Sequence, residues 1–331
     1  MDGAAVSDRP AAAIDVGSNS VRVKVVGPDG DQLARELAIT RLGTGIDATG
    51  RFDEDSLART LDVVERFASV WRDHGVDAGD VRIAATSAVR DAADRDRFFA
   101  GVRDRTGVEA EVLSGEEEAA TAYRGVVSGL DVPRPVAVLD IGGGSTELIV
   151  GDGAGEVAGS WSLQLGSVRL TERYLAGDPP TDAEVAAADG EITRRLDELD
   201  AQLASQGCAV RDATTIVGVA GTVTTVAALD AGLSRYTDGC VHGRRLEVGA
   251  LRAWADRLTG MPSGEIGASP VVQAGREDVI AGGARIAAAV VERYGFDALV
   301  VSEADILDGL ALSALERGTG RGRAREGGRA G

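Results

Sequence analysis

The chain has 331 residues, of which 44% are hydrophobic and 27% charged, values typical of a folded globular protein rather than a disordered one. Its formal net charge of −18 argues against a general nucleic-acid binder. No apolar run reaches the ~18 residues that cross a bilayer, and the first residues lack the pattern of a secretory signal. The two cysteines, Cys208 and Cys240, show no metal-ligand spacing. We therefore expect a cytoplasmic protein with no nucleic acid and no membrane as partner.

The first half of the chain alternates predicted strands and helices. Residues 11–26, "AAAIDVGSNSVRVKVV", indicate a strand, a polar turn and a second strand. Residues 53–75 carry apolar side chains at helical spacing and end at Gly75. The stretch 81–93 favours a strand, a loop and a helix start, and 108–127 favours a strand that runs into a helix. Such alternation is typical of a largely parallel sheet covered on both faces.

The second half repeats this plan after a probable linker at Pro133 and Pro135. Its predicted elements are strands at 136–141, 146–150 and 157–163, a helix at 182–205, the strand "TTIVGVA" leading into "GTVTTVAAL", a helix at 276–295, the strand "ALVVS" and the closing helix "ADILDGLALSALE". The copies align closely, since Asp15 matches Asp140 and Gly17 matches Gly142. We predict an α/β protein of two duplicated domains, 1–130 and 131–302, that face each other across a cleft. A helix at about 303–317 is expected to pack back on the first domain, and residues 318–331 to form a disordered Gly/Arg tail.

The two glycine-containing turns are the first candidates for a binding site. Small residues allow an anion to approach the backbone amides, and hydroxyl groups add donors. A tight hairpin without a ligand is the alternative for either turn alone, but two matching turns, each after an aspartate, favour phosphate binding. The predicted phosphate-binding residues of the turns are Gly17, Ser18, Asn19, Ser20 and the neighbouring Arg22 in the first copy, and Gly142, Gly143, Gly144, Ser145 and Thr146 in the second.

Carboxylates at the ends of the apolar strands suggest a metal ion. Asp15 and Asp140 are costly to bury unless their charge is compensated. A divalent cation, Mg²⁺ or Mn²⁺, between these carboxylates and phosphate oxygens would compensate it. A contact with the local backbone is the alternative. Glu147 either adds a metal contact or is an ordinary exposed strand residue.

The stretch "SGEEEAA" (114–120) contains one acid without an evident structural task. Ser114 and Glu117 have the spacing of a capping box, and Glu116 suits the positive end of the helix dipole. Glu118 has no capping role, so it is either a general base toward water or an ordinary acid on a helix face.

Three further groups have the chemistry of anion sites. They are Thr86, Ser87 and Arg90 at a helix start, Gly221 and Thr222 at a strand-to-helix junction, and Arg276 at the start of a helix. The alternatives are surface ion pairs for the arginines and plain helix capping for the other residues. His74 and His242 lack neighbours that suggest catalysis by histidine.

Together these stretches resemble the exopolyphosphatase / guanosine pentaphosphate phosphatase (Ppx/GppA) family of the actin-like superfamily. The matching pieces are "IDVGSNSVR" (14–22), "RLGTGID" (41–47), "ATSAVRDA" (85–92), "SGEEEA" (114–119), "DIGGGSTEL" (140–148), "LGSVRL" (165–170), "AGTVTT" (220–225) and "EDVIAGGA" (277–284). The resemblance implies two actin-like domains of the RNase H type. It also implies that Glu118 is the catalytic base, that Asp140 and Glu147 belong to a metal site, and that Arg90 binds phosphate.

Three features depart from the family pattern. Asp94 stands where the family usually has Asn, and Leu307 and Asp308 stand where many members have an Arg-Glu pair. The C-terminal extension of long members is missing, so the chain resembles a short, two-domain member.

The expected activity is magnesium-dependent hydrolysis of the terminal phosphate of inorganic polyphosphate, with short chains preferred. Three alternatives stay open: a hydrolase of pppGpp, with pppGpp or ppGpp as ligand, a kinase of the same superfamily, and a non-enzymatic phosphate or alarmone sensor. A homodimer is also left open.

Overall fold

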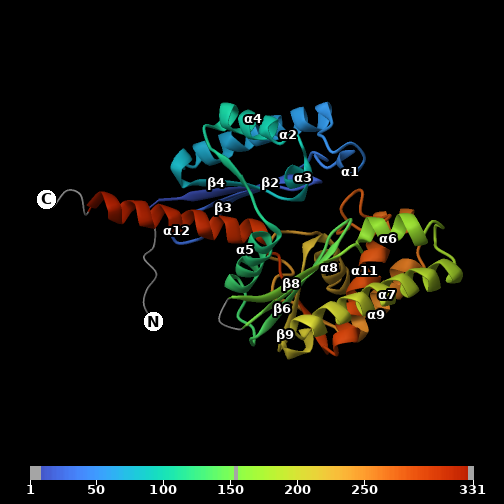
Figure 1. Ribbon diagram of the computed structural model, residues 1–331. Helices are drawn as coiled ribbons and strands as arrows, with labels where there is room; N and C mark the ends of the chain where they lie inside the picture. The colour runs from blue at the N-terminus through green and yellow to red at the C-terminus, as the bar shows by residue number, and fades with distance from the viewer. Residues whose placement is uncertain (1–8, 153–155, 327–331) are drawn as a thin grey trace. The chain divides into compact units, whose positions relative to one another are not determined.

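The computed structural model describes residues 9–152 and 156–326 (Figure 1). The chain divides into two compact units. Unit 1 comprises the chain up to Gly125 together with the segment from Ile306 onward, and unit 2 comprises Val126–Asp305. The expected divisions after residues 130 and 302 lie close to these.

Unit 1 is built on a five-stranded sheet of order β3-β2-β1-β4-β5, in which β1 pairs antiparallel with β2 and parallel with β4. Its strands are β1 (Ala11–Val16), β2 (Ser20–Val26), β3 (Gln32–Ile39), β4 (Val81–Ala85) and β5 (Ala110–Val112). Its helices are α1 (Ile46–Thr49), α2 (Glu54–Asp73), α3 (Ser87–Asp91), α4 (Asp96–Thr106), α5 (Gly115–Ser128, which runs across the boundary) and α12 (Ile306–Glu326).

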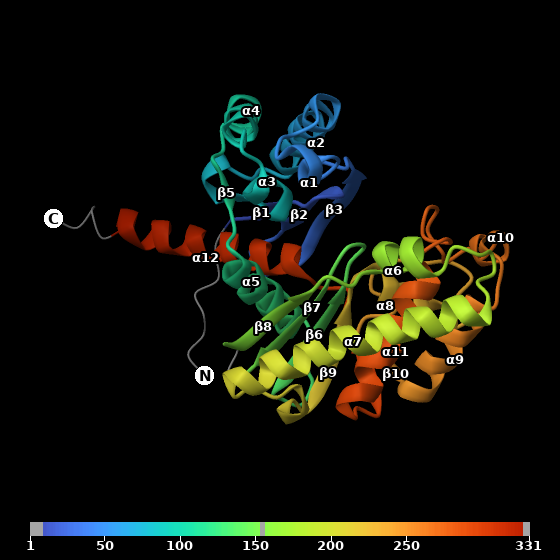
Figure 2. The same ribbon diagram turned by 45° about the vertical axis from the view of Figure 1, so that its right-hand side comes forward.

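Both faces of this sheet are covered (Figure 2). On one face the buried side chains of α2 and α4, among them Phe67, Trp71 and Phe98, pack in one cluster with β1 and β2. On the other face Leu307 and Leu310 of α12 pack in one cluster with alanines of β1 and β4. Burial of these apolar faces is the main force that holds the helices to the sheet.

Two features of unit 1 differ from expectation. Strand β3 was not predicted, because this edge strand exposes Leu33 and Leu37 and presents only small alanines to the core, which obscures the strand pattern. In addition, α12 continues as helix to Glu326, although we expected disorder from residue 318. The remainder of the expected tail, 327–331, lies outside the described residues.

Unit 2 has a six-stranded sheet of order β10-β11-β9-β6-β7-β8. Its strands are β6 (Val136–Ile141), β7 (Thr146–Gly151), β8 (Val157–Leu163), β9 (Thr215–Val219), β10 (Arg245–Glu247) and β11 (Ala298–Val301). Its helices are α6 (Ser167–Tyr174), α7 (Asp182–Gln206), α8 (Ala220–Asp230), α9 (Val248–Thr259), α10 (Ser263–Gly267) and α11 (Ile280–Tyr294). The buried Arg285 of α11 donates to Asp189 of α7 (2.8 Å from Nε) and to Asp256 of α9 (3.1 Å) and so ties three helices together.

The two sheets repeat one topology. The order β3-β2-β1-β4-β5 corresponds to β8-β7-β6-β9-β11, with β10 added in unit 2. The central strands turn in the same way, since Gly17 N–H donates to Ser20 O at 2.9 Å and Gly142 N–H to Ser145 O at 3.0 Å. The predicted α/β class and its duplication are confirmed. Within the described residues, no helix combines the length and apolar character needed to span a membrane.

Candidate functional site

The glycine turn of unit 2 is held by the start of α6. The carbonyls of Gly142, Gly143 and Gly144 accept hydrogen bonds from Ser167 N (2.9 Å), Arg169 N (3.0 Å) and Arg169 Nε (2.7 Å), respectively. The N–H of each following residue belongs to the same planar peptide unit and points in the opposite direction from that carbonyl. Three successive amides, those of residues 143 to 145, therefore face away from α6. Such a set of amides is a ready anion site.

The turn of unit 1 is held in the same manner by a different segment. Ser18 O accepts from Gly43 N at 2.8 Å, and Asn19 O accepts from Thr40 N at 3.0 Å and Arg41 N at 2.9 Å. The amides of residues 19 and 20 consequently face away from the segment 40–43. The hydroxyl of Ser18 also lies 2.9 Å from that of Ser87, the first residue of α3, so two predicted phosphate ligands are brought together.

A Leu-Gly pair stands behind each turn. Leu42 and Leu165 are buried in the cores of their units. The following glycines lie against the turns, because a Cβ at Gly43 would be 3.0 Å from Ser18 Cβ and a Cβ at Gly166 would be 2.4 Å from Gly143 O. No structural role for Leu42-Gly43 or Leu165-Gly166 was predicted, although the Leu-Gly pair that recurs in both copies was the signal that could have indicated one.

Thr146 differs in role from the other predicted residues of the turn. Its buried hydroxyl donates to Leu165 O at 2.6 Å, so it holds the turn from behind and is not directed to a phosphate. This contact corrects the expectation that Thr146 is a phosphate donor.

Asp140 and Glu147 are cross-strand partners in the β6–β7 pair. Burial raises the pKa of Glu147, and hydrogen bonds from Ser145 and Ser162 offset only part of that effect. A carboxylate held in this way is stabilised by a cation, so the donor pair fits a divalent ion that also binds substrate oxygens. Within residues 9–152 and 156–326, no three Asp, Glu, His or Cys side chains form a metal site on their own.

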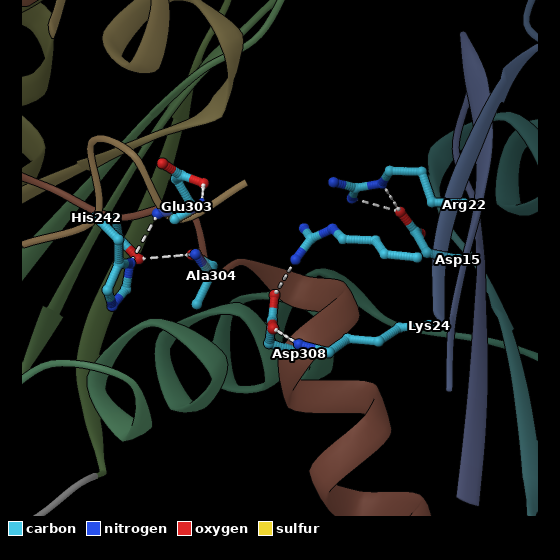
Figure 3. A network of polar contacts seen from close by, with 10 residues as sticks. Asp15, Arg22, Lys24, His242, Glu303, Ala304 and Asp308 are labelled. Carbon is cyan, nitrogen blue, oxygen red and sulfur yellow. Dashed lines mark hydrogen bonds and ion pairs between the residues drawn. The ribbon is translucent and has the colours of Figure 1, made fainter. Parts of the chain in front are cut away.

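Asp15, the counterpart of Asp140, is compensated by an arginine (Figure 3). Its Oδ2 accepts from Arg22 Nε at 3.0 Å and from Arg22 Nη2 at 2.6 Å. This ion pair joins a predicted metal ligand to a predicted phosphate ligand. It also shows how the two copies have diverged, since the residue opposite the aspartate is Arg22 in unit 1 and Glu147 in unit 2.

Asp308 also lies in an ion-pair cluster (Figure 3). Its carboxylate contacts Lys24, the only lysine of the chain, and Arg35 at 3.4 Å. The neighbouring Leu307 is fully buried under the sheet of unit 1. The departure from the family pattern at 307 and 308 thus replaces polar groups with one core residue and one ion-pair partner.

Helix α5 begins with the predicted capping box. Ser114 N donates to Glu117 Oε2 at 2.9 Å and Glu117 N to Ser114 Oγ at 3.2 Å. These hydrogen bonds lower the pKa of Glu117. Glu118 lies instead beside Arg90, whose Nη1 is 3.2 Å from Glu118 Oε2 and 3.0 Å from Leu113 O. Both side chains remain 35% exposed, so the predicted base and a predicted phosphate ligand are adjacent and accessible.

Arg276 and Gly221 form the remaining part of the site in unit 2. A Cβ at Gly221 would lie 1.8 Å from Arg276 Nη1, which places the guanidinium directly on the start of α8. Burial lowers the pKa of Arg276. Among the described residues it has no carboxylate partner, only Thr225 Oγ1 at 3.5 Å. The expectation that Arg276 opens a helix is wrong, because α11 begins at Ile280.

The side chains of both histidines make hydrogen bonds with backbone groups. Nδ1 of His242 accepts from Glu303 N at 3.1 Å (Figure 3). Its Nε2 therefore carries the proton donated to Gly129 O at 2.8 Å. His74 Nδ1 lies 2.8 Å from Val70 O. A cavity of about 300 Å³ in unit 2, between α6, α9 and α11, is lined by none of the predicted site residues. It carries no part of the argument for function.

Known proteins resemble this chain over nearly its whole length. It is 41% identical over 320 residues to exopolyphosphatase 2 of Mycobacterium tuberculosis, a match that covers 91% of this chain and 97% of that protein. It is 34% identical over 219 residues to the guanosine-5'-triphosphate,3'-diphosphate pyrophosphatase of Photobacterium profundum, covering 64% of this chain and 42% of that protein. The crystal structure of the Ppx/GppA family member of Aquifex aeolicus matches with a TM-score of 0.81 and 32% identity, covering 92% of this chain and 97% of that one. Residues 23–318 match the model of the Ppx/GppA phosphatase family, and the chain belongs to that family.

Proposed function

We propose that the protein is an exopolyphosphatase that removes the terminal phosphate of inorganic polyphosphate by hydrolysis. The observation that carries this proposal is the outward set of amides at residues 143 to 145, which suits the non-bridging oxygens of a phosphate. The 41% identity to a protein named exopolyphosphatase 2 supports polyphosphate as the substrate class.

The proposed chemistry assigns one role to each group of residues. Glu118 takes a proton from water, which attacks the terminal phosphorus in line with the leaving bridging oxygen. In each unit the outward amides, with Arg90 in unit 1 and Arg276 in unit 2, are the groups that we propose to bind charged phosphate oxygens and so to oppose the negative charge of the transition state. A divalent cation, for which we propose Mg²⁺, would supply further positive charge when held by Asp140 and Glu147.

The test measures released phosphate from short polyphosphate, long polyphosphate and pppGpp side by side, with purified protein and Mg²⁺. Phosphate release from polyphosphate supports the proposal. Phosphate release from pppGpp alone would mean that pppGpp, and not polyphosphate, is the substrate. A kinase would consume ATP only when an acceptor is added. Tight binding of a ligand without turnover would identify a sensor.

Asp140→Asn is expected to cut activity and to weaken the dependence on Mg²⁺ together, because one of two carboxylates at the ion loses its charge. The measurement is a titration of phosphate release with Mg²⁺. Asp152→Asn, which changes an acid just after β7, is the control and should titrate like the unchanged protein. A normal titration with full activity in Asp140→Asn would remove Asp140 from the metal site.

We expect short polyphosphates to be preferred over long ones. The net charge of −18 repels a long polyanion beyond the site, and the cationic side chains of Lys24 and Arg35 are already paired with Asp308. The measurement is kcat/KM per chain end for short and long substrates at two salt concentrations. Salt screens repulsion between the polymer and the surface but does not supply missing contacts, so the salt dependence separates these causes. An advantage of long chains at both concentrations would contradict the expectation.

A further inference from the structure

Two residues at the start of α6 hold the carbonyls of the glycine turn of unit 2: Ser167, through its N–H and hydroxyl, holds Gly142 O, and Arg169 holds the next two. The backbone N–H of Arg169 holds Gly143 O at 3.0 Å, and its side-chain Nε holds Gly144 O at 2.7 Å. Gly142 O also receives a backbone N–H, from Ser167, whereas Gly144 O is held by the Arg169 side chain, which fixes the peptide that joins Gly144 to Ser145.

The arginine side chain has no other partner that explains its position. The side chain is half-buried, and within the described ranges it forms no ion pair with an acid. Several other arginines of unit 2 extend toward carboxylates, as Arg194 does toward Glu191 at 2.7 Å. The contact with the carbonyl of Gly144 is therefore what orients the Arg169 side chain.

The orientation of this one peptide matters because it decides what faces the anion. With its carbonyl on Arg169, the peptide directs the Ser145 N–H to the side of the other two amides. If the peptide rotated by half a turn, the carbonyl oxygen would face the anion and repel it. Gly144 has no Cβ to hinder such a rotation, since glycine occupies both signs of φ readily. A hydrogen bond from Arg169 is what opposes it.

We propose that Arg169 is a positioning residue for the reaction: its Nε–H holds the Gly144–Ser145 peptide so that the Ser145 amide faces the substrate phosphate. This inference rests on the proposed function, because it concerns the same phosphate site. The contribution of Arg169 to activity is then due to the hydrogen-bond donor at Nε and not to the positive charge of the guanidinium.

Two substitutions at position 169 separate the donor from the charge. In Arg169→Gln the side-chain amide nitrogen occupies the place of Nε, so the donor is kept and the charge is lost. In Arg169→Met a methyl group stands there, and both are lost. We expect kcat/KM for phosphate release to fall at least tenfold in Arg169→Met, in the direction known for the loss of one oriented amide. In Arg169→Gln it should stay within about threefold of the unchanged protein.

The matched control is Arg173→Met, which removes an exposed arginine one turn further along the same helix. It should keep full activity. Thermal unfolding of all variants checks the fold, and Arg169→Leu serves as a second variant without a donor should Arg169→Met be unstable.

A second readout does not need turnover. The amide resonance of Ser145 is followed by nuclear magnetic resonance while inorganic pyrophosphate is added to the full-length protein. We expect it to shift in the unchanged protein and in Arg169→Gln but not in Arg169→Met. Equal losses in the Gln and Met variants would mean that the charge acts directly, and an unaffected Met variant would mean that the bond is incidental; either result overturns the inference. If the unchanged protein released no phosphate, the proposed function would fail while this readout still tested Arg169.

Discussion

Glu118→Gln is expected to lower the turnover of polyphosphate by ~10²-fold or more, the range attributed to one general base, while KM changes little. The substitution keeps the size of the side chain and removes its negative charge, so that it can no longer accept a proton from water and loses its ion pair with Arg90. Glu118 is accessible, lies at the first turn of α5 and is next to Arg90, for which we propose phosphate binding. Single-turnover phosphate release gives the comparison directly.

The neighbouring acid is the natural control. Glu117 is occupied by its hydrogen bonds with Ser114, and its lowered pKa keeps it ionised at neutral pH. Glu117→Gln is therefore expected to affect mainly the stability of the helix start and to leave most of the turnover. Loss of turnover in the Glu117 variant with normal turnover in the Glu118 variant would reverse the assignment.

Gly166→Ala should lower kcat/KM by ~10²-fold, although it removes no functional group. A methyl group at this position would lie 2.4 Å from Gly143 O and 2.6 Å from Gly144 C, which is far inside contact distance. Since both obstacles are backbone atoms, the turn itself must move, and a displacement of about 1 Å at a reacting centre can cost 10²-fold. The backbone of Gly166 is extended (φ −142°), so the alanine brings no conformational strain of its own.

A graded pair of controls tests this explanation. Gly43→Ala places its methyl 3.0 Å from the Ser18 side chain, so it should produce a smaller loss. Gly190→Ala, in the middle of α7 with nothing within 4 Å, should preserve activity and slightly raise Tm. If Gly166→Ala had the activity of Gly190→Ala, the glycine turn would tolerate displacement and the argument from its geometry would fail.

The features that could be predicted from the sequence are those set by neighbours along the chain. The capping box of Ser114 and Glu117 closes within three residues, and both glycine turns connect strands that pair directly. The same holds for Thr86, which the structure places just before α3 as expected. Local patterns of this kind need no knowledge of the packed structure.

What could not be predicted depends on contacts between distant segments. Arg169 and Gly166 contact the second glycine turn from more than twenty residues further along the chain. Helix α11 begins at Ile280 and not at residue 276, and Arg276, which precedes it, lies against Gly221. Arg22 was predicted to bind phosphate, but the register of β1 on β2 sets it against Asp15. The metal role of Asp15 and Asp140 and the phosphate roles of the remaining predicted residues stay predictions.

Unit 1 is completed only when α12, the last helix of the chain, has been synthesised. Its sheet is made from the first part of the chain, but Leu307, Leu310 and Ala311, which cover one face of that sheet, come from α12. Unit 2 is one continuous segment and can fold as soon as it has left the ribosome. The first strands to emerge are thus among the last to be covered, with alanines such as Ala11 and Ala13 facing water throughout translation of unit 2. Nascent chains arrested before residue 306 should accordingly depend on chaperones, whereas chains that include α12 should not.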